Sequence, residues 1–299
     1  MAKIRGKLNH PLAEVFGFPV DNFSHEAKAS RKNRLCPYHH KSANCTKDKA
    51  NNPLGVCSIF EDHANTTIIC PIRFRQNWQI AIDAASFFFS KNEKWTSLTE
   101  VRLQDRNGQS AGNIDVVLVS YDDRGRLINF GSLEVQAVYI SGNIRRLFEK
   151  YSENPDKHFN IDWSSEKNYP RPDYLSSSRK RLVPQLIYKG GIFQAWKKKS
   201  AVALHESFYN TLPALPAVGE KEAEIAWLVY GLDYHHPSKT FKLTKRKVVY
   251  TLFDDSMQRI TKTEAGPVND FISVLQDKLD EKLEGVSPDA PALGEILDT

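Results

Sequence analysis

The sequence predicts a mixed α/β protein. Residues 73–92 place apolar side chains along one stripe at helical spacing, which predicts an amphipathic helix. Two long apolar runs follow, at 113–121 and 126–140, and the DDRG between them is a tight-turn signal that predicts a β-hairpin. Helical and strand patterns then follow each other to residue 283, which is typical of an α/β domain.

Further elements are predicted on both sides of this hairpin. Residues 97–103 read as a short strand and 142–153 as the start of a helix, followed by a polar connector over 152–175. A helical segment, 177–196, is expected to be interrupted or kinked near Pro184 and the Gly190–Gly191 pair. More strands are predicted at 200–208, 224–234 and 246–253, and a last helix at 269–283.

Composition and charge narrow the class of protein. With 299 residues, 40% of them apolar, the chain can bury a substantial core in one elaborate domain or two modest ones. The start of the sequence lacks a secretory signal, and no run approaches the roughly 20 apolar residues of a membrane helix. We therefore expect a soluble, cytoplasmic protein without a membrane partner. The net charge of +5 is compatible with nucleic-acid binding but is shared by many other proteins.

The four cysteines all fall in the first quarter of the chain, in a segment that shows no regular periodicity. Because cytosolic proteins rarely keep disulfides, a zinc or iron ion is the usual reason for such a cluster. Intervals of 8, 11 and 12 residues separate them, which is wider than in zinc fingers, so four buried, inert thiols are the alternative. His39, His40 and His63 are alternative ligands. The candidate ligands are Cys36, Cys45, Cys57 and Cys70.

These patterns divide the chain into three parts. Residues 1–72 are the predicted metal-binding segment, and residues 73–284 are the predicted α/β core. Residues 285–299 form an acidic tail that is expected to be disordered.

The hairpin brings polar residues together in the core. If Arg124 and Gly125 form a two-residue turn, paired residue numbers sum to 249, and Asp115 lies opposite Glu134 with about 5 Å between Cβ atoms. Gln136 lies two residues further on the same face. Two carboxylates this close repel each other unless a cation lies between them, and oxygen ligands favour Mg²⁺.

This arrangement suits phosphodiester hydrolysis, because Mg²⁺ lowers the pKa of a bound water and neutralises charge on phosphate. Glu100, on the preceding strand, is a further candidate carboxylate of the catalytic site. The alternative is a solvated strand face with no catalytic role, and a slip of one residue would move Asp115 to the other face.

With these residues in place, the sequence resembles a known family of nucleases. Asp115 followed by Glu134-Val135-Gln136 resembles the PD-(D/E)XK nuclease motif, with glutamine in place of the usual lysine. Over most of residues 9–255 the chain resembles the NotI-like type II restriction endonucleases. The segments that carry this resemblance are HPLAEVFGFPVDN, RLCPYHH, CTKDKANNPLGVCSI and DYLSSSRKRLVPQLIYKGG.

The resemblance implies a PD-(D/E)XK restriction-endonuclease-like core, in which helices flank a central mixed sheet. It also implies a homodimer that cuts both strands of a GC-rich palindrome. It implies dependence on Mg²⁺, 5′ overhangs, and attack of a metal-activated water on the phosphorus, with Asp115, Glu134 and Gln136 in the active site. It also implies that the four cysteines bind a structural iron ion, with zinc as the alternative. We further expect a bacterial host, a companion methyltransferase that is not a bound subunit, and an EagI-like six-base site, CGGCCG.

Basic residues near this site are the predicted DNA contacts. They are Arg145, Arg146, Arg179, Lys180 and Arg181. Runs of this kind are usually solvated helix faces, but beside a nuclease site phosphate contact is favoured. Two other functions stay open. One is a repair or recombination nuclease of the same fold, and the other is a DNA-binding protein that is stabilised by a bound metal ion and does not cleave.

Overall fold

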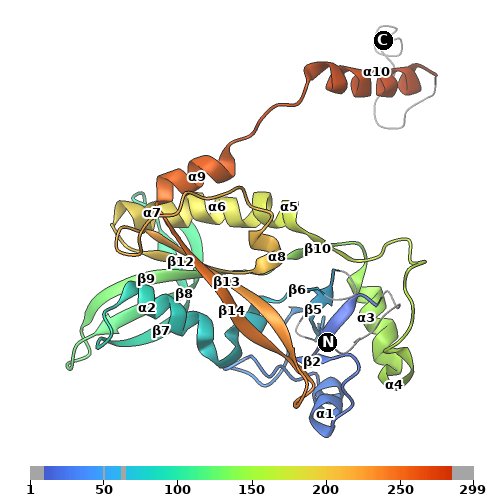
Figure 1. Cartoon of the computed structure of the whole chain (residues 1–299), viewed down its shortest axis with the longest axis horizontal. Coiled ribbons are helices and arrows are strands. Elements are labelled where there is room, and N and C mark those ends of the chain that lie inside the picture. Colours follow the sequence, from blue (N-terminus) through green and yellow to red (C-terminus); the bar gives the residue numbers. More distant parts are fainter. Residues whose placement is uncertain (1–9, 50, 62–64, 285–299) are drawn as a thin grey trace. The chain divides into compact units, whose positions relative to one another are not determined.

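The predicted hairpin lies inside a six-stranded mixed sheet of order β14-β13-β12-β9-β8-β7 (Figure 1). Strand β12 pairs in parallel with β9 and β13, and the other neighbours are antiparallel. The strands are β7 (Lys94–Gln104), β8 (Ser110–Tyr121), β9 (Leu127–Gln136), β12 (Ser200–His205), β13 (Ile225–His235) and β14 (Thr240–Thr251). The mixed α/β architecture with a central mixed sheet is thus confirmed.

The computed structural model describes residues 10–49, 51–61 and 65–284. It divides into two compact units, Met1–Ile260 and Thr261–Thr299, so the predicted boundary at residue 72 does not coincide with a division between units. Besides the six strands of this sheet and the elements described in the following paragraphs, the described residues form six short strands and five helices. They are β2 (Phe18–Pro19), β3 (Asp48–Lys49), β4 (Asn52–Pro53), β10 (Tyr139–Ser141), β11 (Arg171–Asp173), β6 (Thr66–Ile68), α1 (His25–Asn33), α3 (Ile144–Glu153), α4 (Pro155–His158), α8 (Glu206–Tyr209) and α9 (Phe253–Thr261).

The β8–β9 hairpin has the predicted register but a different turn. From Val116↔Leu133 to Ser120↔Asn129 the paired residue numbers sum to 249, as expected. The turn, however, spans Asp122 to Arg126: the Asp122 side chain accepts from the Arg126 N–H at 2.8 Å, and Gly125 adopts φ +76°. A bulge between Ser120 and Tyr121 compensates for the longer turn and restores the register.

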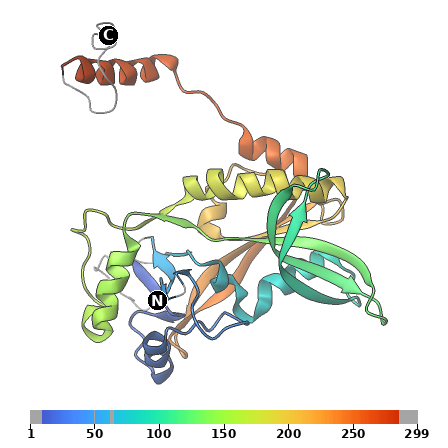
Figure 2. The same cartoon turned by 180° about the vertical axis from the view of Figure 1, so that it is seen from behind.

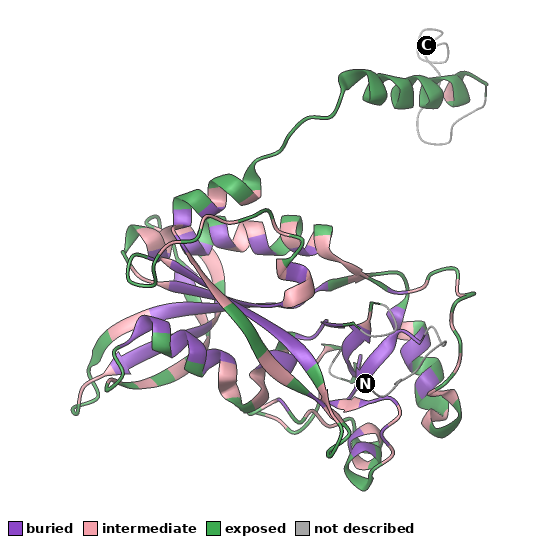
Figure 3. Ribbon diagram, viewed as in Figure 1, coloured by how far each residue is buried: buried purple, intermediate pink, exposed green. Residues whose placement is uncertain are grey.

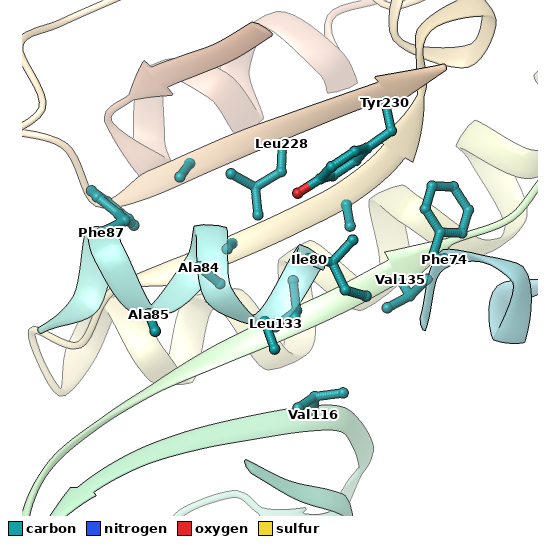
Figure 4. Packing of buried hydrophobic residues seen from close by; sticks show 14 of the residues in the cluster. Phe74, Ile80, Ala84, Ala85, Phe87, Val116, Leu133, Val135, Leu228 and Tyr230 are labelled. Atoms are coloured by element: carbon teal, nitrogen blue, oxygen red, sulfur yellow. The ribbon is translucent and has the colours of Figure 1, made fainter. Parts of the chain in front are cut away.

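Helix α2 (Gln79–Phe88) covers one face of the sheet. Its buried residues pack against alternate residues of the central strands, as Figure 4 shows for Ile80 and Ala84 near Leu133 and Leu228. The predicted helix at 73–92 is shorter than expected because a 3₁₀ segment, η1 (Pro71–Trp78), precedes α2 and contains a kink. At that kink Gln76 has an extended ψ of 117° and Asn77 a left-handed φ of 53°.

A row of helical segments lies over the other face, where the sheet buries Val202, Leu204 and Trp227 (Figure 2). The segments are α5 (Tyr174–Ser177), η2 (Ser178–Leu182), α6 (Val183–Gln185), η3 (Leu186–Gly190) and α7 (Gly191–Ala195). The backbone stays right-handed helical across Pro184 and Gly190–Gly191, so the helix is not interrupted there, and of the two predicted alternatives the interruption is wrong. Instead, η2 and η3 are π turns: the Val183 N–H donates to the Ser178 carbonyl and the Gly191 N–H to the Leu186 carbonyl, each five residues back.

The N-terminal segment is more regular than predicted. Strands β1 (Leu12–Val15) and β5 (Val56–Phe60) form the middle of a four-stranded sheet of order β2-β1-β5-β6. The core beneath it is completed by Phe148 and Tyr151 of α3. Strands this short carry too little periodicity to be recognised, and their stability depends on partners far along the chain.

The smaller unit contains helix α10 (Val268–Glu284), which corresponds to the predicted last helix. Its apolar side chains are exposed, as the colouring of Figure 3 shows for the helix as a whole. The predicted tail, 285–299, lies outside the described residues. Among the helices that the structure describes, none is long and apolar enough to cross a membrane.

Candidate active site

Glu134 and Gln136 lie on the face of β9 that the helical row covers. Their neighbours across β12 are Val202 and Leu204, and they are only 5% and 3% exposed. The alternative of a solvated strand face is therefore wrong. A buried carboxylate and a buried carboxamide need specific partners, because burial without them costs several kcal/mol.

Asp115 lies at the position opposite Glu134, one step beyond the last paired residues, Val116 and Leu133. Its Oδ2 accepts a hydrogen bond from the Val135 N–H at 2.9 Å, which fixes the carboxylate beside β9. Burial raises the pKa of Glu134 to about 7; the nearby Asp115 carboxylate adds to the rise and Lys189 opposes it. The two predicted carboxylates thus share one electrostatic environment.

The helical row supplies two partners that the sequence analysis did not single out. Lys189 Nζ donates to Glu134 Oε1 at 2.9 Å and Oε2 at 2.8 Å, and to the Asn113 carbonyl at 2.7 Å. Gln185 accepts a hydrogen bond from the Gln136 amide. Gln185 and Lys189, four residues apart on the helical row, therefore bind Gln136 and Glu134, which lie two residues apart on β9.

The position of Lys189 in the sequence follows the spacing of an apolar helical stripe. Leu182, Leu186 and Phe193 form a buried stripe on the helical row, and Lys189 occupies the position of that stripe between the last two. A lysine in an apolar stripe has to meet an anion when it is buried. The stripe runs without interruption past Pro184 and Gly190–Gly191, where an interruption or a kink was predicted.

A hollow of about 270 Å³ opens beside these side chains. Lys189, Gln185 and Tyr188 line it from the helical row, and Ala111, Gly112 and Asn113 from β8. Gly112 has φ +99°, a conformation that favours glycine. The hollow therefore reaches Gln185 and Lys189, the two residues that contact Gln136 and Glu134.

Glu100 lies in β7 between the pairs Thr99↔Val116 and Val101↔Ile114, at the position opposite Asp115. It is exposed and has a left-handed φ of 59°. Such a backbone costs of order 1–3 kcal/mol for a residue other than glycine. Its role as a further carboxylate of the site stays a prediction.

The predicted DNA contacts separate into two groups. Arg179, Lys180 and Arg181 are exposed on η2, and Arg181 lies 5.0 Å above the Tyr139 ring, one turn before Gln185. Arg145, in contrast, is engaged within the protein, because its guanidinium pairs with Asp48 and Glu149. Arg146, which lies on the same helix, α3, pairs with Glu166 at 3.1 Å.

All four cysteines carry free thiols, and Cys57 and Cys70 are buried. Burial raises the pKa of Cys36 to about 11; the N–H groups of Tyr38 and His39 oppose the shift, and the Cys70 and Cys45 thiols add to it. The thiols are therefore neighbours in space. In the described ranges, however, no group of three or more His, Cys, Asp or Glu side chains is arranged to hold a metal ion.

The alternative histidine ligands are used elsewhere. His39 Nδ1 accepts from the N–H groups of Lys41 and Ser42, and the His40 ring stacks on Trp78 at 5.0 Å. His63 lies outside the described residues.

Comparison with protein families identifies the chain. The family model described as restriction endonuclease NotI matches residues 16–243, about three quarters of the sequence. This range includes Asp115, Glu134, Gln136, the four cysteines and Lys189. A comparison with curated proteins finds no match. Since the family model covers far more than half of the chain, the protein belongs to the NotI family of type II restriction endonucleases, which are site-specific deoxyribonucleases that act on DNA.

Proposed function

We propose that this restriction endonuclease uses a PD-(D/E)XK site to cut both strands of a GC-rich palindrome, depends on Mg²⁺ and leaves 5′ overhangs. The observation that carries the proposal is the meeting of Asp115 and Glu134 across neighbouring strands beside an open hollow. Glu134 has a pKa near 7, so a modest gain of positive charge is enough to keep it ionised at neutral pH.

The donor set fits a hard divalent cation, because two neighbouring carboxylates, one of them with a pKa raised by burial and by the other's charge, gain most from a cation between them. Asp115 and Glu134 would hold Mg²⁺. When bound, Mg²⁺ supplies acidification of a water molecule and charge neutralisation at the phosphate. Gln136, fixed through Gln185, presents an amide that orients a water molecule or a phosphate oxygen.

The exposed cations on η2 favour contact with DNA near this site. Arg179, Lys180 and Arg181 begin one to two turns before Gln185, so a duplex whose phosphate enters the hollow passes close to them. A palindromic site is matched by a two-fold homodimer in which each subunit cuts one strand. The proposed recognition sequence is CGGCCG.

The four cysteines are proposed to bind a structural iron ion, with zinc as the alternative. Support comes from the mutual proximity of the thiols and from the ammonium of Lys47, which donates to the carbonyls of Val56 and Ile69 and lies near Cys70, Cys57 and Cys45. A buried cation favours thiolates over thiols. Elemental analysis should give about one metal ion per chain for the wild type, and much less for Cys57→Ser. A metal-free, folded wild type would contradict the assignment.

Cleavage itself tests the catalytic proposal. Plasmid DNA is incubated with the protein in Mg²⁺ and in EDTA, and the ends of the products are sequenced. We expect discrete fragments with identical 5′ overhangs in Mg²⁺ alone. Cutting confined to nicks or branched junctions would instead favour a repair or recombination nuclease.

The variant Glu134→Gln should lose at least about a thousandfold in cleavage rate and keep specific DNA binding. The matched control is Glu264→Gln, at a carboxylate that is 86% exposed in the smaller unit, and it should cut like the wild type. Wild-type cleavage by Glu134→Gln would show that the active site lies elsewhere.

A further inference from the structure

The ammonium of Lys189 occupies an unusual place for a structural cation. It has three N–H donors, and the three acceptors at 2.7, 2.8 and 2.9 Å use all of them. Two of these acceptors are the two oxygens of the Glu134 carboxylate. The ammonium therefore lies on the side of the carboxylate from which a divalent cation would contact both oxygens.

Stability alone does not account for a lysine at this position. The side chains of Lys189 and Glu134 are only 8% and 7% exposed, so both charges lose most of their hydration. Buried ion pairs are often replaced by apolar residues without loss of stability. Leucine at position 189, together with an apolar residue at position 134, would continue the stripe formed by Leu182, Leu186 and Phe193 without burying any charge.

The hollow beside Lys189 offers its ammonium a second position, away from Glu134. Lys189 also lines the hollow, and Gly112 beside it has no side chain; a Cβ there would lie 3.8 Å from Lys189 Cε. The four-carbon stem of lysine allows its three donors to rotate between acceptors. An anion in the hollow is thus within reach of the same ammonium that now binds Glu134.

We infer that Lys189 is an exchangeable cation of the active site, which holds Glu134 in place until a divalent metal binds and then contacts the scissile phosphate in the adjoining hollow. This inference rests on the proposed function. The strand position that carries lysine in the usual nuclease motif is glutamine here, and the helical row supplies the positive charge in its place.

Two measurements on Lys189→Met test the inference, with Lys91→Met at an exposed turn as the control. Binding of Mn²⁺ without DNA is measured by isothermal titration calorimetry at mildly alkaline pH. Single-turnover cleavage is measured in saturating Mg²⁺. We expect Lys189→Met to bind Mn²⁺ at least about fivefold more tightly, because its competitor is gone. We expect it to cleave about a hundredfold more slowly, because a phosphate contact is lost. Lys189→Arg should recover part of the rate.

Each other outcome overturns the inference. Tighter metal binding with an unchanged cleavage rate would leave Lys189 as a competitor only. Weaker metal binding with slower cleavage would make it a support for Glu134 that never exchanges. Values within about twofold of the wild type for both would leave it no role.

The controls separate these outcomes from other failures. If Glu134→Gln still cleaves, the proposed function fails; if Glu134→Gln is inactive and Lys189→Met is not, only the inference fails. Should Lys189→Met not fold, Lys189→Gln keeps a hydrogen-bond donor at the buried position and is measured in the same two assays.

Discussion

Arg73 and Glu14 form an ion pair in which neither side chain is exposed to solvent. Arg73 Nε lies 2.9 Å from Glu14 Oε2, and the guanidinium also donates to the Phe241 carbonyl at 3.0 Å. Although burial lowers it, the pKa of Arg73 is raised above its ordinary value by Glu14. One side chain thus joins β1 of the N-terminal sheet to η1 and to β14 of the central sheet.

Arg73→Met should lower the free energy of unfolding by about 3–5 kcal/mol, because Glu14 is left buried without a counterion. Urea unfolding followed by circular dichroism measures this loss. The double variant Glu14→Gln/Arg73→Met should cost clearly less than the single one. Equal losses in both would mean that the charge pair itself is not what the sheets depend on.

His205 should make the protein sensitive to acid. Burial, followed by Arg246 and Arg73, lowers the pKa of this histidine to about 4, from 6.5 when exposed. The unfolded chain therefore takes up a proton at higher pH than the folded one. Protonation of His205 in the unfolded chain therefore lowers the free energy of unfolding by about 3 kcal/mol. The loss begins below about pH 6.5 and is complete near pH 4.

The test compares urea unfolding of the wild type and His205→Gln at neutral pH and near pH 4.5. The loss of stability between the two pH values should be smaller for the variant. His25→Gln, at an exposed histidine of α1, should behave like the wild type. The same acid sensitivity in His205→Gln would assign the effect to other groups.

Cleavage at limiting Mg²⁺ should depend on the ionisation of Glu134. Its pKa is raised to about 7, so protons compete with the metal at and below neutral pH. The single-turnover rate should rise through about pH 7, and higher Mg²⁺ should move the midpoint to lower pH. A midpoint that does not respond to the Mg²⁺ concentration would contradict this competition.

Arg181→Ala should weaken DNA binding to all sequences alike. If Arg181 contacts one phosphate, the slope of log K against log salt falls in magnitude by about one. Fluorescence anisotropy at several salt concentrations gives the slope, and Lys91→Ala is the control. An unchanged slope would place Arg181 away from the DNA.

Much of the site was predictable because it depends on short-range geometry. The β8–β9 register was predicted from a two-residue turn, and the bulge preserves it although the turn is longer, so Asp115 lies opposite Glu134. Lys189 was not predicted, because its contact with Glu134 joins residues 55 apart in the sequence. The N-terminal sheet was missed for the same reason: β1 and β5 are separated by some forty residues and are stabilised mainly by each other and by α3.

The bulge between Ser120 and Tyr121 separates the tip of the hairpin from its base. It absorbs the extra residue of the turn before the strands reach Val119. The turn at the tip can therefore differ in length by one residue without changing the register, provided that a bulge is gained or lost with it. A single insertion without that compensation, more than five residues away, would move Asp115 to the opposite face of the sheet and separate it from Glu134.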